Sequence, residues 1–303
     1  MKRIFTKRVQ SWIELIEEVY HDSWDPDVGA FRSSFVYRGI CNTERGLSTT
    51  LLSTRAANLA GKPLAQFESH ILRNFQKYGH ASAPVGDSIW NWLALAQHHG
   101  LQTRLLDWTY SPFVAMHFVT ERLDAYDLDG EIWCVNHRES NRLLPEPLRR
   151  EAEHSGADAF SAEMLDRVCR TFEELEPLSD RDFVVFLEPP SLDIRIVNQF
   201  ALFSMMSRGE ARLDDWLAQY PRLARRLIVP ARLKWEIRDK LDQAGITERL
   251  LYPGLDGTAR WLSRYYLPRY GRRPDPPTAD SPSISSCAAE SSSASPRRTR
   301  RRG

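Results

Sequence analysis

Hydrophobic positions recur along this chain with two different periods, one typical of helices and the other of strands. Apolar residues follow helical spacing in three early stretches, at residues 12–20, 64–75 and 89–98. Short apolar runs bounded by turn residues are typical of strands, and they occur at residues 34–39, 131–135, 183–187 and 227–229. Helices dominate the first third and strands gather later. The pattern therefore favours an α+β fold, a single domain with a small mixed or antiparallel sheet flanked by helices.

Two further stretches matter for the argument below. Ser111-Pro112 predicts a helix start, with serine as the N-cap and proline in the first turn. The helix that follows, Phe113 to Leu123, is apolar on nearly every side, so we expect it to be buried. The stretch from 193 to 203 is ambiguous but contains an expected strand at 194–197.

Composition limits the classes of protein that fit. The chain has 303 residues, of which 42% are hydrophobic. We treat residues 1–268 as one domain and residues 269–303 as a disordered tail rich in Pro, Ser and Arg. The sequence contains no run of 18 apolar residues, which argues against a membrane span. Glutamates interrupt the N-terminal apolar stretch, so it is unlike a signal peptide. The four cysteines are far apart in the sequence, which favours reduced thiols in a cytoplasmic protein over disulfides or a zinc site.

The net charge of +1 conceals an asymmetry between the body and the tail. From Gly271 onward the chain has seven arginines and three acidic residues, which leaves 34 basic and 37 acidic residues in the body. The body is therefore unlike a broadly basic duplex-binding protein. The arginine-rich end, Arg297 to Arg302, has two interpretations: a solvated tail with weak nonspecific attraction, or a contact with nucleic acid or an acidic membrane surface.

The densest polar stretch lies at residues 97–112, between two apolar segments. Polar groups this close together are costly to bury unless they pair with each other or with a ligand. The helix that starts after Ser111 offers free N–H groups to an anion, and Trp108 and Tyr110 can stack on a ring. Asp107 can orient Arg104 or accept a hydrogen bond from a ribose hydroxyl.

A structural interpretation of the same stretch is equally open. In it Arg104 and Asp107 pair, Trp108 fills the core and Ser111 only caps the helix. We expect Arg104 and Asp107 to be largely buried. The adjacent His98 and His99 project about 100° apart on a helix, so they cannot share one metal ion, and we interpret them as residues that close a helix C-terminus.

Two other segments carry possible chemistry. In Tyr37-Arg38-Gly39, an arginine beside a glycine at a strand end can reach a phosphate, although a surface arginine at a turn is the plainer interpretation. In the second, Arg195, Val197 and Gln199 alternate onto one face if residues 194–197 are a strand. Gln199 can then hydrogen-bond a ligand.

Taken together, these segments resemble the FRG domain, a family named for an aromatic–Arg–Gly motif that here reads Tyr37-Arg38-Gly39. The resemblance spans about residues 30 to 265 and rests on four stretches, namely Tyr37-Arg38-Gly39, residues 97–112, residues 195–200 and Leu251-Tyr252-Pro253-Gly254-Leu255-Asp256-Gly257. FRG proteins occur in settings that suggest bacterial toxins and phage defence, and the resemblance extends these roles to this chain as expectations.

The order of the motifs also resembles the ADP-ribosyltransferase plan, in which a strand arginine contacts NAD, a hydroxyl-bearing segment shapes the nicotinamide pocket and a late strand supplies a glutamate. This resemblance implies NAD as cofactor and a cofactor site made from Tyr37, Arg38, Gly39, Thr103, Arg104, Trp108, Thr109 and Ser111. Gln199 falls near the catalytic glutamate position and is with Asp107 a catalytic candidate, but it cannot bear the glutamate's charge. Either Asp107 or Glu188 acts, a weaker polar mechanism operates, or the domain binds without catalysing.

The leading hypothesis is an NAD- or nucleotide-binding protein that transfers ADP-ribose to a nucleic acid or protein, without a membrane partner. A non-catalytic sensor that binds nucleotides or nucleic acid is the alternative. A third possibility is a hydrolase that uses Asp107 with His98 or His99. The first two require the chain to bring Arg38, the 103–111 segment and Gln199 together.

Overall fold

The computed structural model describes the chain except for residues 1–2, 54–63, 81–85, 192 and 268–303. The chain divides into two compact units, residues 1–262 and 263–303, and every residue of the candidate site lies in the first. The expected disordered tail, with Cys287 and the terminal arginines, lies outside the described residues. Within the described part, no helix has both the length and the apolar character needed to cross a membrane.

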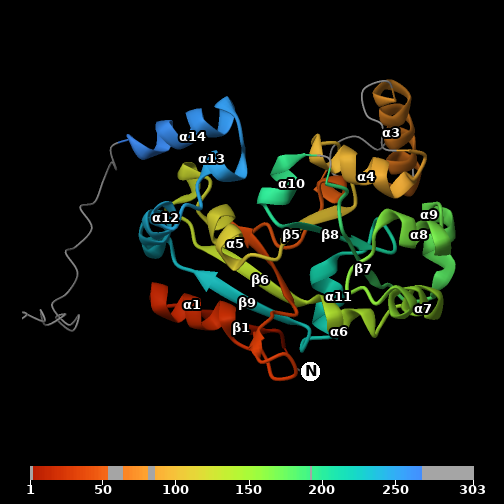
Figure 1. Cartoon of the computed structure of the whole chain (residues 1–303), viewed down its shortest axis with the longest axis horizontal. Coiled ribbons are helices and arrows are strands. Elements are labelled where there is room, and N and C mark those ends of the chain that lie inside the picture. The colour runs from red at the N-terminus through yellow and green to blue at the C-terminus, as the bar shows by residue number, and fades with distance from the viewer. Residues whose placement is uncertain (1–2, 54–63, 81–85, 192, 268–303) are drawn as a thin grey trace, which may run out of the picture. The chain divides into compact units, whose positions relative to one another are not determined.

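A mixed sheet of seven strands forms the centre of the described structure, in the order β1-β9-β6-β4-β5-β8-β7 (Figure 1). The strands are β1 (Phe5–Arg8), β4 (Phe35–Ile40), β5 (Leu105–Thr109), β6 (Gly130–Asn136), β7 (Val184–Leu187), β8 (Ala201–Met206) and β9 (Ala224–Val229). β1 runs parallel to β9, whereas the other neighbours are antiparallel. A separate hairpin pairs β2 (Trp24–Asp25) with β3 (Ala30–Phe31). This architecture confirms the α+β prediction.

The helices cover the sheet on both faces. They are α1 (Trp12–Tyr20), α3 (Leu64–Gly79), α4 (Ile89–His98), α5 (Pro112–Val119), α6 (His137–Asn141), α7 (Glu146–Ser155), α8 (Ala162–Val168), α9 (Phe172–Leu175), α10 (Ile194–Asn198), α11 (Leu213–Gln219), α12 (Lys234–Gln243), α13 (Glu248–Leu251) and α14 (Leu255–Tyr265). α1 and α4 have the predicted bounds. The Ser111 hydroxyl caps α5 by accepting the Val114 N–H at 3.4 Å, as predicted, although α5 ends four residues earlier than expected.

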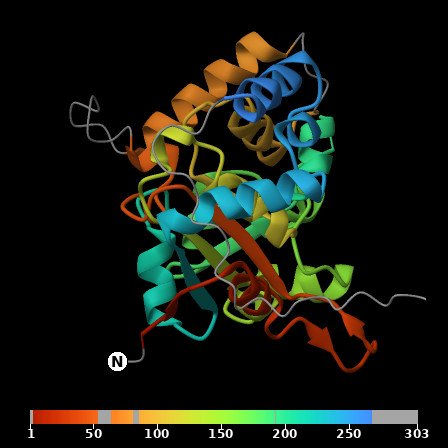
Figure 2. The same ribbon diagram turned by 90° about the vertical axis from the view of Figure 1, so that its left-hand side faces the viewer.

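Strand alternation sends the apolar side chains to opposite faces of the sheet. On one face, Val36, Trp108 and Phe186 form a core with Trp216 of α11. On the other face, α1, α5 and α12 cover the β4–β6–β9 side, where α12 crosses in front of the strands in the turned view (Figure 2).

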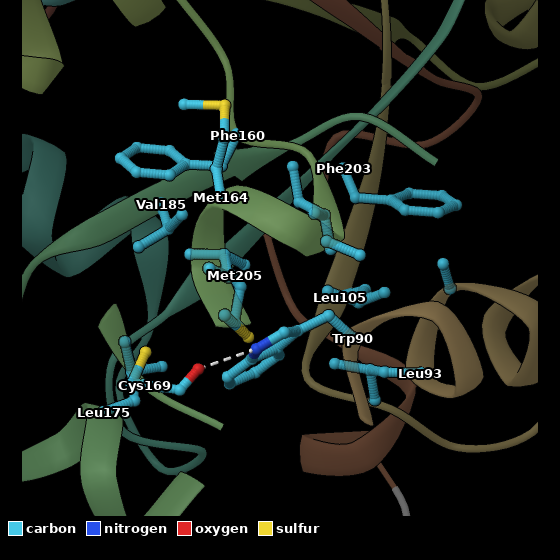
Figure 3. Close-up of a cluster of buried hydrophobic side chains, with 14 of the residues drawn as sticks. Trp90, Leu93, Leu105, Phe160, Met164, Cys169, Leu175, Val185, Phe203 and Met205 are labelled. Carbon is cyan, nitrogen blue, oxygen red and sulfur yellow. Dashed lines mark hydrogen bonds between the residues drawn. The ribbon is translucent and has the colours of Figure 1, made fainter. Parts of the chain in front are cut away.

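The part of this second face formed by β5, β7 and β8 is covered by α4, α7, α8 and α9. Trp90 of α4 is fully buried there, and its Nε1–H donates to the Cys169 carbonyl at 3.0 Å (Figure 3). Cys41, Cys134 and Cys169, the described cysteines, are buried free thiols, as predicted.

The predicted strand at 194–197 is wrong, because these residues form the helix α10. The Asp193 carboxylate accepts the Arg195 N–H at 2.8 Å and so caps the helix. This local hydrogen bond compensates for the strand preference of the β-branched residues in the sequence Ile-Arg-Ile-Val. The expected alternation of Arg195, Val197 and Gln199 on a strand face is therefore absent.

Candidate functional site

Three of the sequence motifs meet on three adjacent strands. β4 carries Arg38, β5 carries Asp107 and Thr109, and β8 begins two residues after Gln199. In the sheet β5 lies between β4 and β8, with Thr109 opposite Tyr37 on one side and Ala201 on the other. Segments more than 60 residues apart in sequence therefore become neighbours.

Arg38 bridges β4 and β5 where the two strands separate, since their pairing is limited to Tyr37 and Thr109. Its Nη1 donates to the Asp107 carbonyl at 2.5 Å and lies 3.6 Å from the Asp107 carboxylate. The Nε atom is buried and has no hydrogen-bond partner among the residues that the structure describes. Burial lowers the pKa of Arg38, and the Asp107 charge opposes that shift. The guanidinium therefore keeps unused donor capacity.

Asp107 presents an oriented carboxylate to solvent. Its side chain is 57% exposed, so the expectation that it is buried is wrong. Gln97, in the last turn of α4, donates from Nε2 to both carboxylate oxygens at 3.1 Å. The Gln97 side-chain oxygen, Oε1, in turn accepts from the Thr103 hydroxyl at 2.5 Å. Gln97, which the sequence analysis left without a role, thus fixes the carboxylate from one side while Arg38 contacts it from another.

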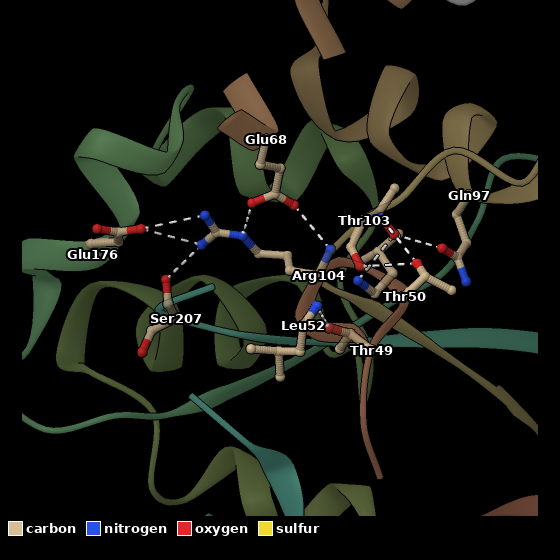
Figure 4. A network of polar contacts seen from close by, with 10 residues as sticks. Thr49, Thr50, Leu52, Glu68, Gln97, Thr103, Arg104, Glu176 and Ser207 are labelled. Carbon is tan, nitrogen blue, oxygen red and sulfur yellow. Dashed lines mark hydrogen bonds and ion pairs between the residues drawn. The ribbon is translucent and has the colours of Figure 1, made fainter. Parts of the chain in front are cut away.

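Arg104 directly precedes β5, and its partners differ from those of Asp107. As expected it is buried, but its partner is Glu68 of α3 rather than Asp107 (Figure 4). Its Nε donates to the Glu68 carboxylate at 2.6 Å, and its Nη1 donates to the Ser207 carbonyl at 2.9 Å. Glu176 completes the network at 3.3 Å. Protein groups among the described residues therefore satisfy the Arg104 guanidinium.

Several predicted cofactor residues have structural partners. Tyr37 is in the core, where its hydroxyl donates to the Val19 carbonyl at 2.9 Å. Trp108 is buried and donates from Nε1 to the Ser204 hydroxyl at 2.8 Å. A Cβ on Gly39 would lie 1.8 Å from the Ala115 carbonyl oxygen, so glycine is required for α5 to pack on β4. These residues position the strands that carry Arg38 and Asp107.

The hydroxyl segment connects the end of β5 to Gln199, which lies two residues before β8. The Thr109 hydroxyl donates to the Gln199 carbonyl at 2.7 Å and accepts the Ser111 N–H at 3.0 Å. The Gln199 side chain donates to the Leu251 carbonyl at 3.0 Å. The structure therefore brings Gln199 beside the segment, but its amide is directed to α13.

The two histidines close α4, as predicted, with His99 as the C-cap. The His98 Nε2 lies 2.7 Å from the Asp193 carboxylate, so its acidic partner is Asp193 and not Asp107. The Arg195 N–H, with His98 adding to it, lowers the pKa of Asp193. An aspartate directly before an apolar run is a helix N-cap signal, and it would have identified Asp193. No group of potential metal ligands occurs in the described chain.

Comparison with known proteins agrees with this geometry. Residues 33–127 match the model of the FRG domain, a segment that contains β4, β5 and α5. No curated protein and no solved structure shows a significant match to the chain. The chain therefore contains a segment, residues 33–127, that matches the FRG domain, and both Arg38 and Asp107 lie within it.

Proposed function

We propose that this protein binds NAD or a closely related nucleotide at Arg38 and Asp107 and transfers ADP-ribose to an acceptor. The observation that carries the proposal is the adjacency of β4, β5 and β8. An arginine strand, a strand that leads into a hydroxyl-bearing helix start, and a late strand are the three parts of the ADP-ribosyltransferase plan. Here they stand side by side in one sheet.

The donor set fits the phosphates of such a cofactor. A guanidinium offers five N–H groups, and among the described residues only Nη1 of Arg38 has a hydrogen-bond partner. A phosphate can accept the remaining donors in the planar, paired geometry that arginine favours. Tyr110, at 36% exposure, is accessible for stacking on a ring, whereas Trp108 is not.

Asp107 is the carboxylate best placed to act in transfer. When bound, NAD supplies an activated ribose carbon whose bond to nicotinamide can be exchanged for a bond to the acceptor. Asp107 accepts the acceptor's proton as a general base, with Gln97 and Arg38 holding its oxygens in place. Glu188 contacts the Tyr110 hydroxyl at 3.4 Å and serves as the second candidate.

The test combines NAD binding by calorimetry with transfer from labelled NAD to proteins and nucleic acids of a cell extract. Arg38→Ala should abolish measurable NAD binding. Asp107→Asn keeps the shape of the side chain, so it should bind NAD within about threefold of wild type while transfer falls by about 10²-fold or more. Arg150→Ala, an exposed arginine of α7, is the matched control.

Wild-type protein that neither binds NAD nor transfers its label would refute the proposal. If Asp107→Asn retains ADP-ribose transfer and Glu188→Gln loses it, the general base is Glu188 and not Asp107. A toxin or defence role in the cytoplasm, which we also propose, requires that induced expression slows growth for the wild type and not for Arg38→Ala.

A second function, nucleotide binding without catalysis, is favoured by one observation. The residue near the glutamate position of the plan is Gln199, two residues before β8, and its side-chain amide donates to the Leu251 carbonyl. NAD binding that depends on Arg38, with no transfer or NAD cleavage in any extract, would support this function over the first.

A further inference from the structure

Three arginines next to the candidate site stack on aromatic rings. The Arg195 and Arg260 guanidinium carbons lie 4.9 Å and 5.0 Å from the centre of the Tyr252 ring. Arg249 lies 4.7 Å from the centre of the Trp261 ring. Stacking on a ring holds a guanidinium in a fixed orientation and leaves its N–H edge available.

These arginines differ from several others of this protein in forming no ion pair with a described residue. In the part of the chain that the structure describes, none of the three forms an ion pair, whereas Arg104, Arg208 and Arg226 each do. The Arg195 Nε is buried and has no described hydrogen-bond partner. Two guanidinium groups on one ring repel each other, so an anion that contacts both would relieve that repulsion.

Exposed apolar side chains continue the same surface. On α10 and just after it, Ile194 is 56% exposed, Val197 is 50% exposed and Phe200 is 56% exposed. Phe200 has a φ of +49°, which is rare for a bulky residue, and it directly follows the C-cap of α10, where a left-handed residue commonly ends a helix. An aromatic ring held in solvent is a platform on which an unpaired base can stack.

Two hydrogen bonds join α10 to α13. The Asn198 side chain donates to the Leu250 carbonyl at 2.8 Å, and Gln199 donates to the next carbonyl. These bonds hold α10 against α13, and we call the region formed by Arg195, Phe200, Arg249 and Arg260 on and beside these helices the α10–α13 surface. It adjoins the candidate site through the bond between Thr109 and the Gln199 carbonyl.

We propose that the α10–α13 surface binds single-stranded nucleic acid, with Arg195, Arg249 and Arg260 on phosphates and Phe200 on a base. Arginines on aromatic rings beside an exposed aromatic platform suit a chain that offers both phosphates and unstacked bases. The positive charge is local, since the body as a whole has more acidic than basic residues. Binding of the nucleic acid is independent of the proposed function. That this nucleic acid also accepts ADP-ribose rests on the proposed function.

The test is fluorescence anisotropy of labelled 12-nucleotide single strands of RNA and DNA, without NAD, over a series of salt concentrations. The triple variant R195A/R249A/R260A should reduce the slope of log affinity against log salt by about 2, because each lost phosphate contact removes about 0.7. The control R142A/R149A/R150A changes the net charge equally, at the C-cap of α6 and on α7, and should retain the wild-type slope.

Phe200→Asn tests the stacking separately. Asparagine tolerates a positive φ, so the backbone is preserved while the ring is lost. Single-strand affinity should fall at least about fivefold, which corresponds to the lower end of one base's stacking energy. A duplex of the same sequence should bind more weakly than the single strand and be insensitive to Phe200→Asn.

Three results would overturn this assignment: no single-strand binding at low salt, equal losses in the two triple variants, or equal binding of the duplex. The proposed function fails differently. Arg38→Ala should remove NAD binding and leave oligonucleotide affinity unchanged, whereas R195A/R249A/R260A should do the reverse. Loss of one activity therefore leaves the other measurable.

Discussion

Arg38 and Arg104 are both strand-associated arginines near acidic residues, yet their surroundings differ in kind. Arg104 is 1% exposed, and its guanidinium meets Glu68, Glu176, the Ser207 carbonyl and the Phe172 ring. Arg38 has a 22% exposed side chain, one hydrogen bond to a carbonyl and a more distant carboxylate. The Arg104 guanidinium is thus hydrogen-bonded and ion-paired by protein groups, whereas Arg38 has N–H donors without a described partner.

This difference separates structure from function within one polar stretch. A buried charge is tolerated only when it is paired and hydrogen-bonded, so the Arg104 network has to be complete for the chain to fold. An arginine whose N–H donors lack partners within the protein contributes less to stability, and those donors can bind a ligand. The comparison predicts that mutations on the Arg104 side change stability, whereas mutations on the Arg38 side change activity.

The largest effect should come from Glu68→Gln, which keeps the shape of the side chain and removes its charge. Arg104 would then be buried with only the partly exposed Glu176 as a countercharge, and we expect the free energy of unfolding to fall by about 3–5 kcal/mol. Urea denaturation measures it. The matched control Glu176→Gln, at a residue whose side chain is 30% exposed, should cost less than about 1 kcal/mol. Equal losses in the two variants would break the comparison.

The next effect is expected at Gly39, the neighbour of Arg38 in the aromatic–Arg–Gly motif. Alanine there would place a Cβ 1.8 Å from the Ala115 carbonyl oxygen, which forces α5 away from β4. Overpacking of this kind costs about 1–3 kcal/mol. Gly209→Ala is the control, since its Cβ would meet its nearest atom at 3.4 Å. Thermal denaturation measures both variants. Equal melting temperatures would mean that Gly39 is not required for the packing of α5 on β4.

A third effect concerns His137, which is buried like Arg104 but has no described ion-pair partner. Burial lowers its pKa below 6.5, and its Nδ1–H donates to the Ser34 carbonyl at 2.7 Å. Below pH 6.5 the unfolded chain therefore binds a proton that the folded chain resists, so stability falls as pH falls. One proton gives a slope of at most about 1.4 kcal/mol per pH unit.

His137→Asn keeps a donor for the Ser34 carbonyl and removes the titration. Unfolding measured between pH 7 and pH 5 should then depend less on pH than in the wild type. His154→Asn, at an exposed histidine of α7, should leave the dependence as it was. An unchanged slope in His137→Asn would mean that other groups cause it.

The sequence predicts the parts of this molecule that local patterns determine. Helical spacing gives the bounds of α1 and α4, and the Ser111-Pro112 pair gives the start of α5. The family motifs identify Arg38 and Asp107, but not which acidic residue each arginine meets. That choice depends on strand register and on which face each side chain takes, and both are set by distant segments such as α3 with Glu68.

The same limit explains the errors at α10 and Asp107. Ile194 and Val197 suggest a strand, but the Asp193 cap and the contacts with α13 favour a helix whose apolar side chains stay exposed. Asp107 lies in an apolar strand, which suggests burial, yet Gln97 holds it at an open position. In both places a polar contact between distant segments overrides the local preference, and both places adjoin the candidate site.

The smallest effect on stability, and the sharpest test of the comparison, is expected for Arg38→Ala. The substitution removes one hydrogen bond to the Asp107 carbonyl from a side chain that already has an unpartnered Nε, so the free energy of unfolding should change by about 1 kcal/mol or less. NAD binding should nevertheless disappear, because the donors that are unused in the protein are the ones available to a phosphate. A loss of stability as large as that of Glu68→Gln would show instead that Arg38 belongs to the structural network, and the distinction between the two arginines would fail.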